Sequence, residues 1–228
     1  MGRHIYVIIL CGGVSFLKDV NRLEKIIKTL QNNNVEYEIY TNCNYYTVLL
    51  NFIDKHEISS DDILWIYFTG HGKILGKRIN GNVKMISTWI YNNSNNDECY
   101  VYSYKIDSLL TGVDANIVLM SDSCHSGGFT NFYTGSSPLI FVGSSSIIHT
   151  SINVSDGILV NLLESYIIPN VSSYMKYEVI GCGIFMNIFM REFSDALNIY
   201  SKKNNILSKP IIKYYNIIQN EFTLNKVI

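Results

Sequence analysis

This sequence has a small net charge, no Cys-x-x-Cys pair and no long apolar run. The formal net charge is −1, which excludes a globally basic field, so we expect no nucleic-acid partner and no membrane binding. The five cysteines are scattered and form no Cys-x-x-Cys pair. This favours a reducing, intracellular, cytoplasmic location over a disulfide framework or a zinc site. The apolar run 5–11 is too short to span a membrane and lacks a signal-peptide layout.

The composition that remains is that of a globular protein with a sizeable core. Apolar residues make up 47% of the 228 positions and charged residues 16%, which is typical of a folded chain rather than a disordered one. No internal repeat or long linker divides the sequence, and Pro138 and Gly143 bracket a strand rather than a boundary. We therefore expect one domain, residues 1–228, acting as a monomer.

Apolar periodicity predicts strands that alternate with helices. The continuous β-branched run 5–11 is typical of a strand buried on both faces. Further strands are predicted at 35–42, 62–69, 115–123, 137–145 and 209–216, with a weak hairpin at 77–91. Helices are predicted at 18–31, 45–58 and 106–110, and within 156–168 and 172–200. This alternation indicates an α/β fold with a mostly parallel six-stranded sheet flanked by helices.

Two reactive side chains directly follow buried strands. His71 comes after "ILWIYFTG" and Cys124 after "NIVLMSDS". Ligands bind at the carboxyl edge of an open α/β sheet, so on neighbouring strands the two residues would face each other across one or two spacings of about 5 Å. An imidazole lowers the pKa of a nearby thiol or takes its proton. The pair therefore predicts a nucleophile and its base.

The neighbours of this pair suggest further roles and exclude others. Gly72 can approach a substrate closely and, with the backbone N–H of Cys124, stabilise an oxyanion. His125 adjoins the thiol in sequence, so we expect its ring to point elsewhere and not to act as the base. A zinc site made of His71, Cys124 and His125 lacks a fourth ligand. A lone cysteine after a strand is otherwise usually a small buried residue.

The segments "YFTGHG" and "SDSCHSGG" resemble the two signatures of metacaspases, the caspase-like cysteine peptidases, whose usual forms are "YSGHG" and "DSCHSG". The stretch "FLKDVNRLEKIIKTLQNNN" resembles the helix that opens with "NDV" in that family, and "KPIIKYYN" takes the place of the last strand. The resemblance implies a caspase-like three-layer sandwich. Residues 1 to about 135 would correspond to the large subunit and about 136 to 228 to the small subunit, with no prodomain ahead of the first strand.

The resemblance also implies an activity and a set of site residues. His71 and Cys124 match the catalytic dyad of a cysteine endopeptidase, and Gly72 matches the oxyanion glycine. Asp19 and Asp122 match two acids of the primary specificity pocket, which implies polypeptide substrates cleaved after Arg or Lys. An alternative interpretation of Asp19 is an acid favoured at the start of a helix by the helix dipole.

The sequence departs from this family where calcium would bind. Asn131 stands seven residues past Cys124, where an acid is expected. Between His71 and Asn131 the acids are Asp97, Glu98, Asp107, Asp114 and Asp122, too few for a strong calcium site. We expect no metal or other cofactor, with weak or absent calcium activation. Two other functions stay open: an inactive caspase-fold regulatory or binding protein, and a related peptidase of different specificity.

Overall fold

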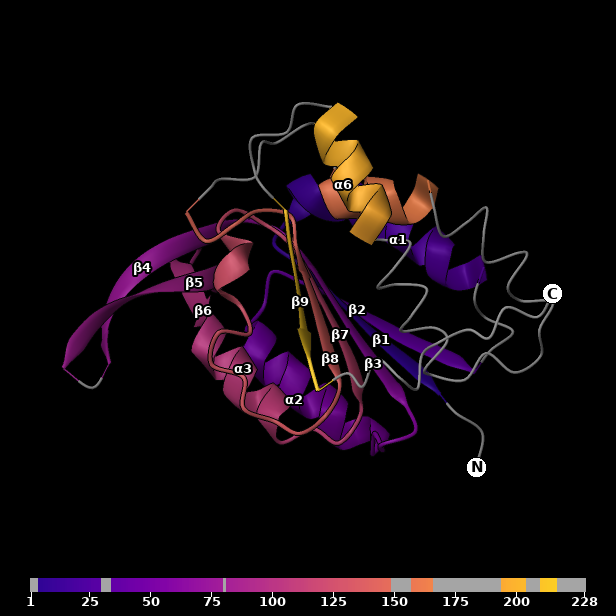
Figure 1. Ribbon diagram of the computed structural model, residues 1–228, viewed down its shortest axis with the longest axis horizontal. Coiled ribbons are helices and arrows are strands. Elements are labelled where there is room, and N and C mark those ends of the chain that lie inside the picture. Colours follow the sequence, from indigo (N-terminus) through magenta and orange to yellow (C-terminus); the bar gives the residue numbers. More distant parts are fainter. Residues whose placement is uncertain are drawn as a thin grey trace.

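A six-stranded sheet forms the middle layer of the molecule (Figure 1). The computed structural model describes residues 4–29, 34–79, 81–148, 157–165, 194–203 and 210–216. The strand order is β2-β1-β3-β7-β8-β9. The strands are β1 (Ile5–Cys11), β2 (Val35–Thr41), β3 (Ile63–Thr69), β7 (Asn116–Asp122), β8 (Leu139–Gly143) and β9 (Ile211–Tyr215). All neighbours pair in parallel except β9, which is antiparallel to β8. The predicted mostly parallel α/β sheet is confirmed.

Helices cover both faces of this sheet. Figure 1 shows α1 (Leu17–Thr29) and α6 (Ser194–Lys203) on one side, and α2 (Tyr45–His56) and α3 (Ser103–Thr111) on the other. The strand β1 explains the arrangement. Val7 and Ile9 pack in the cluster that contains α1, the helical residues 158–165 and α6. Ile8 and Leu10 pack in the cluster of α2 and α3. A strand buried on both faces needs a continuous apolar run, as this one has.

The predicted helices agree with the structure where the chain is described. The periodic pattern runs to Leu30, and α1 is described to Thr29. The helix α2 begins after Asn44, whose side chain accepts a hydrogen bond from the backbone N–H of Thr47 at 3.4 Å. Such a cap satisfies one of the unpaired N–H groups at a helix start. Of the helix predicted within 172–200, residues 172–193 lie outside the described residues.

A second, antiparallel sheet corrects the prediction for the middle of the chain. It consists of β4 (Gly72–Ile79), β5 (Asn82–Asn92) and β6 (Glu98–Tyr102). The predicted hairpin at 77–91 was therefore too short, and β6 was missed. Glu98 begins β6 and pairs with Lys73. The reason is that strand preference depends on cross-strand partners, which polar alternation in "GKILGKRI" does not reveal.

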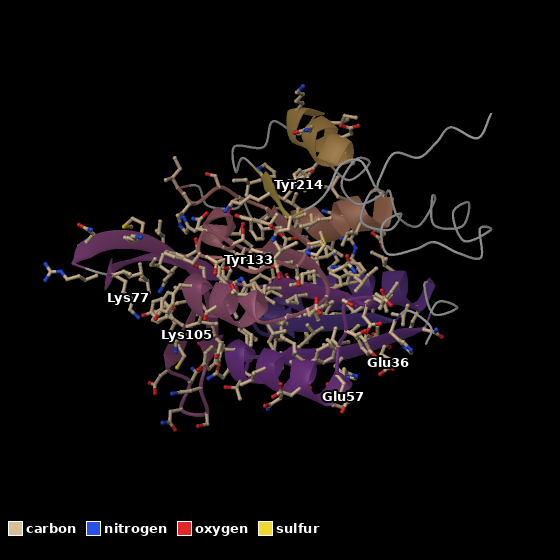
Figure 2. The ribbon with its side chains drawn as sticks, turned by 60° about the horizontal axis from the view of Figure 1, so that its bottom comes forward. Glu36, Glu57, Lys77, Lys105, Tyr133 and Tyr214 are labelled. Atoms are coloured by element: carbon tan, nitrogen blue, oxygen red, sulfur yellow. The ribbon has the colours of Figure 1, made fainter. Side chains whose placement is uncertain are left out.

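The hairpin of β4 and β5 projects from the body of the molecule (Figure 1). Figure 2 shows Lys77 on this projecting ribbon. The hairpin starts directly after His71, so the end of β3 leads straight into it. Within the described part of the chain, no helix is both long and apolar enough to cross a membrane.

Candidate active site

Strand pairing brings the two reactive motifs to the same edge of the sheet. β3 and β7 are parallel neighbours, with Thr69 opposite Asp122. The backbone N–H of Gly70 donates to the carbonyl of Asp122 at 3.3 Å, so the pairing continues past the strand end. His71 and Cys124 each lie two residues beyond this register pair. Adjacent strands are about 5 Å apart, so the backbones that carry the imidazole and the thiol are neighbours.

Gly72 lies against the backbone of Cys124. A Cβ atom at position 72 would stand closer than 3.0 Å to the Cys124 carbonyl oxygen, so a side chain does not fit there. Ile90 N–H donates to the His71 carbonyl at 3.1 Å, which makes Gly72 and Trp89 a non-hydrogen-bonded pair of the antiparallel ladder. This alternation turns the Gly72 N–H away from β5. An oxyanion donor must point away from the sheet ladder in this way, because its N–H has to reach the substrate oxygen.

Aromatic packing fixes the hairpin that follows His71. The Trp89 ring on β5 is fully buried and stacks between Phe68 and Phe129, with centroid distances of 4.6 Å to each. Its indole N–H donates to the Ser121 hydroxyl on β7 at 2.9 Å. A buried tryptophan with a satisfied N–H makes a rigid anchor. The start of β4 is therefore held at the end of β7.

The imidazole and the thiol differ in exposure. The His71 side chain is exposed, and the Phe16 ring meets it edge-on with centroids 5.0 Å apart. Cys124 is half-buried and carries a thiol, not half of a disulfide. His125 adopts the left-handed conformation with φ 57°, and its Nδ1 lies 3.0 Å from the Ile147 carbonyl oxygen. This contact directs the His125 ring to the segment that follows β8.

Asp19 is buried, although it lies in the first turn of α1. One carboxylate oxygen accepts a hydrogen bond from the Thr69 hydroxyl at 3.1 Å, and the other accepts one from the backbone N–H of Gly157 at 3.1 Å. A first-turn acid that only met the helix dipole would face solvent. Asp19 therefore joins the end of β3 to the segment that starts at Gly157.

Asp122 is also buried, at the end of β7. Its Oδ2 accepts hydrogen bonds from the Tyr67 hydroxyl at 3.2 Å and from the backbone N–H of Leu159 at 2.9 Å. Burial raises the pKa of the Asp122 carboxyl to about 6, and the negative charge of Asp19 also raises it. Burial disfavours the charged form of an acid unless a cation offsets it.

The two carboxylates meet at Gly157. A Cβ atom on this glycine would stand closer than 3.0 Å to Oδ2 of Asp122 and 2.8 Å from Oδ2 of Asp19. The N-terminus of the helical residues 158–165 therefore faces both acids. A helix N-terminus carries only about half a positive charge, so two ionised carboxylates leave a net negative site. The metacaspase resemblance implied that Asp19 and Asp122 form a pair, and the structure brings the two carboxylates together at Gly157.

Four partners of these acids were missed in the sequence: Tyr67, Thr69, Gly157 and Leu159. Tyr67 lies two residues before Thr69 on β3, and this same-face spacing is a signal that could have revealed it. The N–H groups of Gly157 and Leu159 have no such signal, because every residue except proline has a backbone N–H.

The other acids considered for calcium are not gathered into one site. Asp107 is fully buried on α3 and accepts hydrogen bonds from the backbone N–H of Thr130 at 2.8 Å and of Phe132 at 2.9 Å. Burial raises its pKa to about 6. Asp97 bonds to the side chain of Asn93 in its own loop. Among the residues that the structure describes, no three His, Cys, Asp or Glu side chains form a metal-binding group.

Comparisons with known proteins add no family to this geometry. No protein-family model matches the chain, and a search of curated proteins finds no match. What the site can do therefore follows from its own residues.

Proposed function

We propose that this protein is a caspase-like cysteine endopeptidase of the metacaspase type, one domain that cleaves polypeptides after Arg or Lys. One observation carries the proposal. His71 and Cys124 lie at equal positions beyond paired residues of two adjacent parallel strands, with Gly72 packed on the Cys124 carbonyl. The sheet order, with a final antiparallel strand, is compatible with a caspase-like three-layer sandwich.

The proposed chemistry is nucleophilic catalysis in two steps. His71 takes the proton of the Cys124 thiol, and the thiolate attacks the carbonyl carbon of the scissile peptide bond. The N–H groups of Gly72 and Cys124 hold the oxygen that becomes negatively charged. His71 then gives its proton to the leaving amine, and water assisted by His71 releases the acyl group from the sulfur.

The buried acids support a preference for a basic side chain. The backbone N–H of Gly157 donates one hydrogen bond to Asp19, and that of Leu159 donates one to Asp122. Two such bonds leave part of the negative charge of the acids uncompensated. An arginine or lysine side chain would supply the missing cation. An aspartate side chain would add a third negative charge, which is strongly unfavourable in a buried place.

A second function is an inactive caspase-fold regulatory or binding protein. The specific observation in its favour is that both acids already bind backbone N–H groups at the start of the helical residues 158–165. In this case Asp19 and Asp122 would only anchor that helix. The sequence segments 149–156 and 166–193 lie outside the described residues, so the choice between the functions is made by experiment.

An irreversible peptide inhibitor separates the two functions. We expect a peptidyl-arginyl chloromethyl ketone to modify Cys124 stoichiometrically, because the thiolate of an active dyad displaces chloride from the bound reagent and is alkylated. A matched peptidyl-aspartyl reagent should react far more slowly. Peptide mapping by mass spectrometry identifies the modified cysteine. Cys11, Cys43 and Cys99 in the same sample are internal controls. An unmodified Cys124, or equal modification by both reagents, would contradict the proposal.

Calcium is expected to activate this enzyme weakly or not at all. Each carboxylate oxygen of Asp107 accepts a hydrogen bond from a backbone N–H group, and Glu98 pairs with Lys73. Few carboxylates without such partners are therefore left near the site. The measurement is hydrolysis of an arginyl peptide from chelated to millimolar calcium. A saturable rise of about a hundredfold would show that other oxygens form a calcium site, and the prediction would be wrong.

A further inference from the structure

A lysine from β9 reaches the loop that follows Cys124. The Lys213 ammonium donates hydrogen bonds to three oxygens: the carbonyl of Gly127 at 2.7 Å, the carbonyl of Phe129 at 2.8 Å and Oδ1 of Asn131 at 2.7 Å. An ammonium has three N–H donors and no acceptor. All three donors are therefore used, and all three acceptors belong to one short segment.

This segment needs an external donor because of its local conformation. Residues Ser126–Gly128 form a single 3-10 turn, and the Ser126 carbonyl accepts from the Phe129 N–H at 3.0 Å. The carbonyls of Gly127 and Phe129 point past the end of this turn, where a helix leaves its C=O groups unpaired. These groups carry partial negative charge, so a cation is the favourable partner. Lys213 supplies it.

The ammonium is partly withdrawn from water. Lys213 is half-buried, and Nζ lies 5.3 Å from the centroid of the Phe141 ring. Burial lowers the pKa of Lys213 to about 8, and the charge of Asp107 on α3 opposes this. Below about pH 8 the side chain is thus a cation among fixed oxygens, and its bonds to them are stronger than in water.

Other contacts from β9 and α3 hold the same loop. The Tyr215 hydroxyl donates to the Thr130 carbonyl at 2.9 Å, and Asp107 accepts from the Thr130 N–H at 2.8 Å. The Tyr215 ring packs edge-on against Tyr133, with centroids 5.5 Å apart. Figure 2 labels Tyr133, two residues past Asn131, and Tyr214 on β9. Side chains from two separate elements, β9 and α3, therefore hold the loop in place.

On its opposite side the loop packs closely against backbone. A Cβ atom on Gly127 would stand 2.7 Å from the Ile147 nitrogen, and the Ser126 hydroxyl donates to the Ser145 carbonyl at 3.0 Å. The bonds from Lys213 and Tyr215 on the other side hold the loop against this backbone. Only His125 and Ser126 lie between Cys124 and Gly127, so a shift at Gly127 is passed to the thiol.

We propose that Lys213 is a positioning residue for Cys124, acting as a built-in cation that fixes the loop 126–131 and thereby the thiol. Carbonyl and amide oxygens are ligands that calcium would also accept, and here an ammonium already binds them. The cation that orders the loop is thus part of the chain. The positioning of Cys124 for catalysis rests on the proposed function, whereas the ordering of the loop does not.

Hydrogen–deuterium exchange tests the loop directly. In Lys213→Met, which keeps an apolar stem and removes the charge, we expect the amides of 126–131 to exchange at least about tenfold faster while those of α2 are unchanged. In Lys213→Ala, millimolar propylammonium should restore slow exchange and 1-propanol should not. Lys202→Met, which removes an exposed lysine on α6, is the matched control. Unchanged loop exchange in Lys213→Met, or equal rescue by propanol, would overturn the proposal.

A milder variant keeps the test decisive if Lys213 variants fail to fold. Asn131 is exposed and supplies one acceptor, so Asn131→Ala removes one bond without disturbing the core. We expect about two- to fivefold faster loop exchange in Asn131→Ala and slower exchange in Asn131→Asp, which adds a negative charge beside the ammonium. Equal exchange in Asn131→Ala, Asn131→Asp and the unmodified protein contradicts the role of Lys213.

Kinetics separate this inference from the proposed function. If the protein hydrolyses arginyl peptides, Lys213→Met should lower kcat about tenfold or more with KM within about twofold, and propylammonium should restore kcat in Lys213→Ala. Full kcat in Lys213→Met would overturn the positioning role and leave the peptidase intact. Faster loop exchange in a protein without any peptidase activity would reject the proposed function and retain the ordering role of Lys213.

Discussion

Cys124→Ala and His71→Ala are each expected to abolish hydrolysis of arginyl peptides, with a loss on the order of 10⁴-fold or more in kcat. The double variant is expected to be little slower than either single variant. The reason is that a thiol without its base is a poor nucleophile at neutral pH, and an imidazole without the thiol has nothing to activate. Residues that act as a unit show such non-additive effects. Steady-state rates of all three variants test this.

The controls for the dyad are other thiols and the stability of the fold. Cys43→Ala removes a half-buried thiol from the segment between β2 and α2, away from the paired ends of β3 and β7, and should keep full activity. Thermal unfolding of Cys124→Ala should be close to that of the unmodified protein, because a half-buried thiol contributes little apolar area. Substantial hydrolysis by Cys124→Ala would end the assignment of Cys124 as the nucleophile.

Asp122→Asn is expected to lower kcat/KM for arginyl peptides. The loss corresponds to a transition-state free energy that is higher by on the order of 2–5 kcal/mol. A buried guanidinium would lose a charged partner, which is costly because water cannot replace it. Asp19→Asn should have an effect of the same kind. The comparison is made with an otherwise identical peptide that carries a neutral residue before the scissile bond. Its kcat/KM should change much less.

The pH dependence of this preference follows from the pKa of Asp122. Burial first, and then the charge of Asp19, raise that pKa to about 6, so the carboxylate is ionised above about pH 6. The kcat/KM for arginyl peptides, relative to the neutral peptide, should therefore rise as pH increases through about 6. In Asp122→Asn this rise should disappear. If the rise in relative kcat/KM persists in Asp122→Asn, a different titrating group causes it.

Stability distinguishes a specificity pocket from a helix anchor. A carboxyl whose pKa is higher in the folded state binds its proton more tightly there, so its contribution to stability is complete below about pH 4 and is lost as pH rises through about 6. Asp122→Asn should therefore lose little stability above pH 6. If both Asp→Asn variants unfold at lower temperature at every pH and keep their preference for arginine, the acids only anchor residues 158–165.

Much of the fold could be predicted because it depends on local patterns. The run in β1 is apolar at every position, so burial on both faces follows, and alternation with the helical period of α1 and α2 indicates a parallel sheet. The hairpin of β4 and β5 could not be delimited in this way. Its outer part alternates polar side chains, and its inner end is fixed by the stacking of Trp89 between Phe68 and Phe129, which joins three separate segments.

The reactive groups of this protein can be read from its sequence: a thiol and an imidazole that each follow a buried strand, and the two acids Asp19 and Asp122. The contacts that hold these groups in place arise only in the folded chain. Asp19 meets the N–H of Gly157 across 138 positions, and the Lys213 ammonium meets the Gly127 carbonyl across 86. The sequence shows the chemistry of each side chain, whereas backbone N–H and C=O groups are the same at nearly every residue. Which of them a distant side chain finds is settled only when the sheet brings the segments together.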